Sequence, residues 1–184
     1  MKSIFIGMLF VFLNFDLNIG NASIGLIPNV IGYYFMLKGL SEMVDFSERF
    51  AKVIPIVQVM MVFSVITYVL ALIGGSVNVD IQSGYYVITP LNWSMLAFGF
   101  VSVVISLYIS YNIIMGIRDI ELAQFRDLNV VQLYLLWKLK VLFAPLIFFI
   151  FIAPAIAIIG TVISFVIAVI YLFAFNKAKN LYYA

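Results

Sequence analysis

The chain has 184 residues, of which 66% are hydrophobic and 10% charged, with a formal net charge of +2. An ordinary soluble domain carries about 25% charged residues, so this composition excludes a water-soluble globular protein and indicates an integral membrane protein. Cysteine and histidine are absent, which excludes disulfides, thiolate nucleophiles, histidine bases and the usual zinc sites.

The charges are clustered, and residues 53–79, 81–117 and 141–176 carry none. About 20 helical residues cross a hydrocarbon core of about 30 Å. The last run is long enough to cross twice, with a turn at Pro154. The sequence predicts one all-α transmembrane domain over residues 1–184, a bundle of six helices spanning approximately residues 3–19, 23–40, 53–75, 92–116, 130–153 and 155–176.

Lysine and arginine collect on the cytoplasmic side of membrane proteins, and in this arrangement all ten basic residues fall toward one side. They are Lys2, Lys38, Arg49, Lys52, Arg118, Arg126, Lys138, Lys140, Lys177 and Lys179. Both termini are therefore predicted to be cytoplasmic. Lys138 and Lys140 lie inside the fifth span, and we expect their long stems to reach the cytoplasmic headgroups. Basic residues spread over loops in this way predict no nucleic-acid partner.

The first span allows a second interpretation, because Lys2, an apolar stretch and the small residues Gly20 and Ala22 also fit a cleaved secretory signal. The stretch between the first two spans is unusually polar. We take Asn14, Asp16, Asn18 and Asn29 as a candidate polar or solute site near the outer face. Asp16 either caps a helix in the headgroup layer or lies within the bilayer, where ionisable residues are functional candidates.

Residues Gly25 to Leu40, GLIPNVIGYYFMLKGL, resemble a segment of an uncharacterised family of multi-span membrane proteins from Gram-positive bacteria. In that family an acidic residue often follows the proline, whereas Asn29 stands here. The resemblance implies a bacterial plasma membrane and no particular activity.

Two connectors and one outer segment complete the predicted architecture. Met43, Phe46 and Phe50 lie at helical spacing after the second span, which predicts a short amphipathic helix on the cytoplasmic interface. The connector after the fourth span is similar when shifted by 77 residues, so a duplicated two-span unit is an alternative. Residues 76–91 contain β-branched and aromatic runs around a Ser-Gly pair, which favours a small extracellular β-hairpin.

Two spans carry small or polar residues at helical spacing. Ser102 and Ser106 lie on one face of the fourth span and extend the candidate polar site. In the sixth span, small residues form a candidate helix-packing face, because such residues let helices approach closely. That face comprises Ala157, Gly160, Thr161, Ser164 and Ala168.

These patterns predict no catalytic, metal-binding or cofactor-binding residue and no cofactor. The expected function is that of a non-enzymatic, multi-pass plasma-membrane protein in the lipid bilayer, which assembles with itself or with a membrane subunit. The alternative is a small transporter or channel component that uses the polar site near the outer ends of spans 1, 2 and 4.

Overall fold

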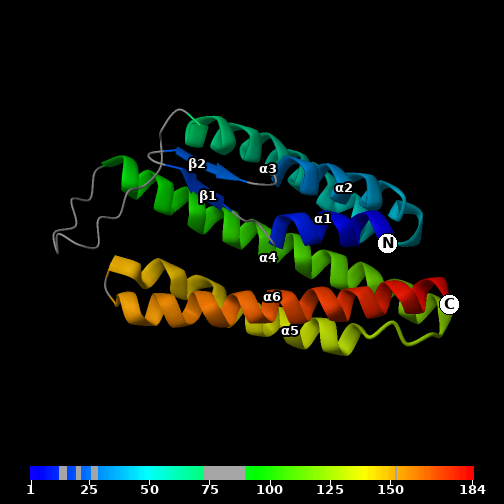
Figure 1. Cartoon of the computed structure of the whole chain (residues 1–184). Coiled ribbons are helices and arrows are strands. Elements are labelled where there is room, and N and C mark those ends of the chain that lie inside the picture. The colour runs from blue at the N-terminus through cyan, green and yellow to red at the C-terminus, as the bar shows by residue number, and fades with distance from the viewer. Residues whose placement is uncertain (13–15, 20–21, 26–28, 73–89, 152) are drawn as a thin grey trace.

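The computed structural model describes residues 1–12, 16–19, 22–25, 29–72, 90–151 and 153–184, and these form a helical bundle (Figure 1). Its helices are α1 (Lys2–Phe12), α2 (Asn29–Ser41), α3 (Glu48–Leu72), α4 (Pro90–Gln124), α5 (Val130–Phe143) and α6 (Pro154–Tyr183). Short 3-10 helices are η1 (Val44–Phe46) and η2 (Ala144–Phe151). Four segments, in α3, α4, α5 with η2, and α6, are long and apolar enough to cross a membrane.

The first two elements differ from the predicted spans 3–19 and 23–40. Helix α1 ends at Phe12 and α2 begins at Asn29, and between them lies an antiparallel hairpin of β1 (Asp16–Ile19) and β2 (Ala22–Gly25). Its register pairs Asp16 with Gly25 and Ile19 with Ala22. Gly20 and Asn21, which separate the strands in the sequence, are residue types that favour hairpin turns. The hairpin predicted over residues 76–91 lies almost wholly outside the described residues.

Glycines allow α1 and α2 to pack at very short range. A Cβ atom added to Gly7 would lie 2.6 Å from the carbonyl oxygen of Gly32, and one added to Gly39 would lie 2.5 Å from the backbone nitrogen of Ile4. Both distances are far inside van der Waals contact. Glycine is therefore required at this helix contact, which also packs against α3 and α6.

The connector after α2 is shorter than the predicted amphipathic helix. It consists of η1 followed at once by α3, because Ser47 adopts an extended backbone and starts a new helix. Met43 and Phe50 point into the core, whereas Phe46 is exposed.

Helices α4, α5 and α6 lie where the sequence predicts the last three spans. The predicted fourth and sixth spans end at residues 116 and 176, whereas α4 continues to Gln124 and α6 to Tyr183. Helix α5 changes to 3-10 geometry at Ala144, one residue before Pro145, which lacks the backbone donor that a regular helix needs. The predicted turn at Pro154 is confirmed, since α6 begins there. The Trp137 indole N–H donates to the carbonyl oxygen of Leu107 at 2.9 Å and joins α5 to α4.

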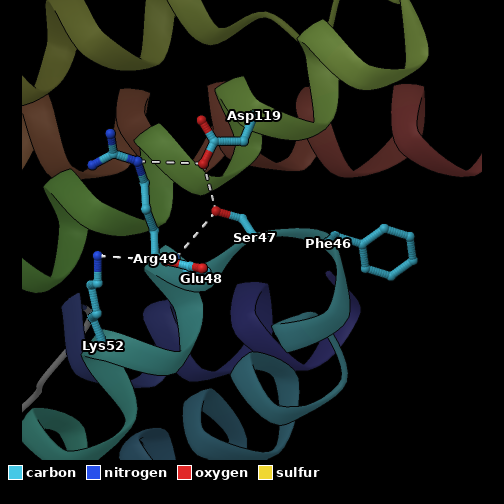
Figure 2. Close-up of a pocket in the computed structure, with 6 residues that line it drawn as sticks. All are labelled: Phe46, Ser47, Glu48, Arg49, Lys52 and Asp119. Atoms are coloured by element: carbon cyan, nitrogen blue, oxygen red, sulfur yellow. Dashed lines mark hydrogen bonds and ion pairs between the residues drawn. The ribbon is translucent and has the colours of Figure 1, made fainter.

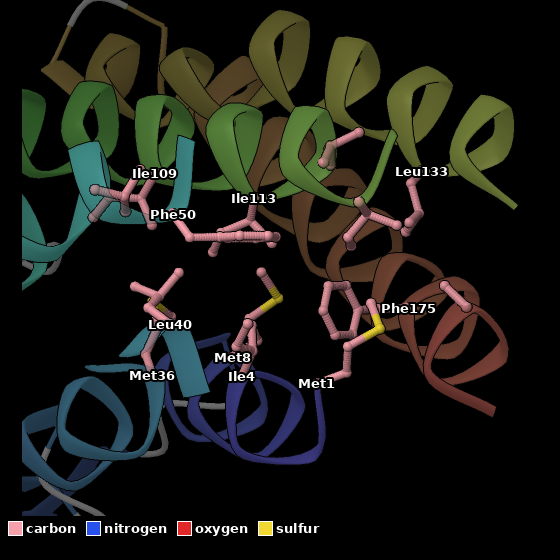
Figure 3. Packing of buried hydrophobic residues seen from close by; sticks show 14 of the residues in the cluster. Met1, Ile4, Met8, Met36, Leu40, Phe50, Ile109, Ile113, Leu133 and Phe175 are labelled. Carbon is pink, nitrogen blue, oxygen red and sulfur yellow. The ribbon is translucent and has the colours of Figure 1, made fainter. Parts of the chain in front are cut away.

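The core lies where α1, α3, α4 and α6 converge, and its largest buried side chains include Phe50, Ile113 and Phe175 (Figure 3). The two ends of the chain are adjacent, with the Met1 amine 3.4 Å from the Tyr183 hydroxyl. The start of α1, the α2–α3 and α4–α5 connectors and the end of α6 share this end of the bundle (Figure 1). Because it carries most of the basic residues, we call it the basic end.

Candidate functional site

A polar cluster at the basic end joins the start of α3 to α4. Ser47 precedes α3 with φ −162° and ψ 132°, and its Oγ accepts a hydrogen bond from the Arg49 backbone N–H at 3.2 Å. This is the geometry of a helix N-cap. The same hydroxyl donates to Asp119 Oδ2 at 2.5 Å. One serine therefore both starts α3 and connects it to a helix that lies 72 residues away in sequence.

Asp119 also forms an ion pair with the side chain of Arg49. Arg49 Nε lies 3.4 Å from Asp119 Oδ2, and both side chains are 41% exposed. Lys52 lies 3.9 Å from Glu48 on the solvent side of α3. Together with Phe46, these residues line an open pocket of about 330 Å³ (Figure 2).

An aromatic contact beneath the cluster sets the separation of the two helices. Phe50 is fully buried one turn after Ser47. Its ring lies against Gly116, one turn before Asp119, and a Cβ atom at Gly116 would lie 2.5 Å from the Phe50 ring. Only glycine lets the Phe50 ring fit here, and the contact holds Ser47 and Arg49 within reach of Asp119.

The side chains that line this pocket can bind polar groups by charge and hydrogen bonding. It offers two cationic and two anionic side chains, so its lining has no net charge, and its single aromatic ring is exposed at the rim. Across the described ranges, no group of three acidic side chains is placed to hold a metal ion.

The sequence-predicted polar site is only partly visible. Asn14 lies outside the described residues, and Asp16 and Asn18 are described as backbone positions in β1. Asn29 begins α2, and its Oδ1 is buried without a hydrogen-bond partner among the described residues.

The serines of the fourth span do not join that site in the described structure. Ser102 donates to the Phe98 carbonyl oxygen of its own helix at 2.8 Å, and Ser106 is half-buried on the same helix. Helix α4 packs on α3, α5 and η2, whereas α2 packs on α1 and α3. The described helices thus leave Ser102 and Ser106 apart from Asn29.

The predicted packing face of α6 is used inside the chain. Ala157, Gly160 and Ala168 are buried, and a Cβ atom at Gly160 would lie 2.5 Å from the Leu146 Cβ of η2. Thr161 is exposed and donates to the Ala157 carbonyl oxygen, and Ser164 is half-buried. Gly160 therefore lets η2 approach α6 closely.

Sequence reasoning missed Ser47 and Asp119 and misjudged Lys140. Ser47 stands before an acidic first turn, and this pattern identifies a helix N-cap from the sequence. Its hydrogen bond to Asp119 depends on how α3 packs against α4. Lys138 is exposed, as expected of a snorkelling side chain, whereas Lys140 is buried. Lys140 Nζ lies 3.4 Å from the centroid of the Phe12 ring, not at a headgroup surface.

Comparison with protein-family models, with curated proteins and with solved structures gives no match. The resemblance of residues 25–40 to a Gram-positive membrane family stays a prediction.

Proposed function

We propose that this chain is a six-pass protein of a bacterial plasma membrane. In this proposal the basic end faces the cytoplasm, and the protein acts without catalysis by assembling with itself or with another membrane subunit through that end. Four crossings are the long apolar segments of α3, α4, α5 with η2, and α6. The other two crossings are made by α1 and α2 together with the strands between them.

Length supports these two mixed crossings. The 11 residues of α1 extend about 16 Å at 1.5 Å each, and the 4 residues of β1 add about 13 Å. Their sum is close to the 30 Å of a hydrocarbon core. A strand at that depth needs its edge covered by protein, and β2 packs against α3.

The observation that carries the assembly proposal is a pair of exposed apolar side chains at the end of α4. Leu122 is 62% exposed and Phe125 is 96% exposed, and both lie beyond the charge-free run that ends at Ile117. Phe125 also has φ 51°, a conformation that is rare for a bulky residue. Exposed apolar surface rimmed by polar residues marks sites of contact with proteins or membranes, and we infer that Leu122 and Phe125 form part of such a contact.

A photoreactive phenylalanine analogue at position 125 tests this proposal in native membranes. We expect irradiation to give a protein adduct of discrete mass, either a dimer of this chain or a complex with one other subunit. The matched control is position 173, since Phe173 is 71% exposed within the apolar segment of α6, and it should give lipid adducts. If position 125 also yields lipid adducts alone, the assembly proposal is wrong.

A second candidate function, a transporter or channel component, is favoured by Asn29. A buried amide oxygen without a partner is costly, and in this function a polar solute would supply the missing contact. Solute flux into vesicles should then fall in Asn29→Ala, whereas Ser102→Ala, a position apart from Asn29 whose hydroxyl bonds its own helix, is the matched control and should transport as wild type. Assembly as the sole function predicts that both variants behave as wild type.

A further inference from the structure

Lys140 is a cation enclosed by three helices. It lies ten residues into α5, about 15 Å from Val130 along the helix axis, and is 9% exposed. Its Nζ lies 3.4 Å from the ring centroid of Phe12 in α1 and 5.3 Å from that of Tyr171 in α6. The ammonium group thus lies between aromatic faces within an apolar bundle.

No anion accompanies this charge in the described part of the chain. The two ion pairs there are Arg49–Asp119 and Lys52–Glu48, both at the basic end. The described polar side-chain contacts of α5 are made by Trp137 and by Asn129, which precedes the helix. Lys140 takes part in none of these contacts. Aromatic faces attract an ammonium group, but they do not cancel its charge.

Tyr171 supplies a second, independent observation. Its side chain is fully buried, and its hydroxyl has no hydrogen-bond partner in the part of the chain that the structure describes. Buried hydroxyls normally have a partner. Two polar side chains on different helices, Lys140 on α5 and Tyr171 on α6, therefore have no acceptor among the described residues of this apolar interior.

The missing ligand must accept hydrogen bonds. A lysine ammonium has three donors and no acceptor, and a tyrosine hydroxyl can donate as well. A ligand with one negative charge would neutralise the ammonium group of Lys140. The attraction between the two charges is strong because the apolar surroundings have a low dielectric constant. The Phe12 and Tyr171 rings pack edge to face, with centroids 5.8 Å apart, which restricts the ligand to a small one.

We propose that Lys140 and Tyr171 bind a small monovalent anion of the size of chloride, nitrate or acetate within the bundle. Phe12 closes the site from α1. The site lies away from the basic-end pocket, and the proposal does not depend on assembly through Phe125.

Thermal unfolding of the purified protein tests the site, with sodium concentration and ionic strength held fixed while gluconate is replaced by chloride, nitrate or acetate. A ligand that binds only the folded state raises the midpoint in a saturable way. We expect this rise in wild type for at least one small anion. The site is refuted if the wild-type midpoint is the same in all four salts.

Three variants locate the effect. Lys140→Met should lose the anion-dependent shift, whereas Lys138→Met, which changes an exposed lysine two residues away, should keep it. Tyr171→Phe should need on the order of tenfold more anion for the same shift, because one hydrogen bond to a charged group is lost. An equal shift in wild type and Lys140→Met would place the anion elsewhere and overturn the proposal.

Direct binding keeps the test independent of how the variants fold. Wild-type protein should retain radiolabelled chloride, and an excess of unlabelled chloride, nitrate or acetate should displace it. If wild type binds none of these anions at concentrations up to about 0.5 M, the proposal is wrong even if Lys140→Met fails to fold.

Discussion

Ser47 contributes to two elements at once, which makes it the most informative residue of the basic end. Its hydroxyl accepts from the first turn of α3 and donates to Asp119 of α4. The side chain is buried, whereas the adjacent Arg49–Asp119 pair is partly exposed. Exposed ion pairs add little to stability, so the serine should matter more than the salt bridge above it.

We expect Ser47→Ala to lower the free energy of unfolding by about 1–2 kcal/mol, since it removes a helix cap and a hydrogen bond to a charged group. Arg49→Ala should cost at most about 1 kcal/mol. Lys52→Ala, at a longer and more exposed pair, is the control and should cost less. Chemical unfolding in detergent measures all three, and an equal loss in Lys52→Ala and Ser47→Ala would contradict this order.

At the residue scale, the sequence predicts contacts within a helix and not those between helices. The Glu48–Lys52 ion pair joins residues at i, i+4 spacing, which the sequence alone displays. Asp45 and Arg49 have the same spacing, yet Arg49 pairs with Asp119. Which acidic residue pairs with Arg49 depends on how α4 packs against α3. The residues next to Arg49 in the sequence do not reveal this contact.

At the scale of elements, close helix approach depends on where glycines lie. Gly99 and Gly116 lie on the same helix, but a Cβ atom at Gly99 would be 3.5 Å from Phe148, an ordinary contact, whereas one at Gly116 would be 2.5 Å from Phe50. An alanine at position 99 should therefore change helix propensity alone, whereas an alanine at position 116 should also disturb packing.

Gly99→Ala should raise stability by up to about 1 kcal/mol through helix propensity. Gly116→Ala should lower stability by about 1–3 kcal/mol, because the buried Phe50 ring has to shift. Melting temperatures of the two variants should therefore move in opposite directions. Equal stabilisation of both would show that the contact between α3 and α4 is looser than described here.

Elements with a strong local signal were predictable. The apolar runs predicted the long helices, and Pro154 predicted the start of α6. The first two predicted spans were expected to be helical throughout, whereas α1 and α2 are shorter and a hairpin of mixed polarity, DLNI and ASIG, lies between them. Those strands lack the β-branched and aromatic runs that normally identify strands. The packing of β2 on α3 is a tertiary contact that this pattern does not reveal.

The whole molecule is closed at the basic end by contacts between the two ends of the chain. Phe5 stacks on Phe175 with centroids 6.3 Å apart, and the Met1 amine reaches Tyr183. Burial lowers the pKa of the Met1 amine, although Glu42 opposes this shift. These contacts put both termini at the same end of the bundle.

Cysteine accessibility tests the orientation on which the proposed function depends. The chain has no cysteine, so each single-cysteine variant is free of background labelling. Asp45→Cys and Gln124→Cys place exposed thiols in the two connectors at the basic end. Ser83→Cys places a thiol in the segment between α3 and α4, which the proposed arrangement puts outside the cell. With an impermeant thiol reagent on intact cells, we expect labelling of Ser83→Cys, and labelling of the other two only after permeabilisation. Labelling of Asp45→Cys or Gln124→Cys in intact cells would contradict the six-pass arrangement with a cytoplasmic basic end.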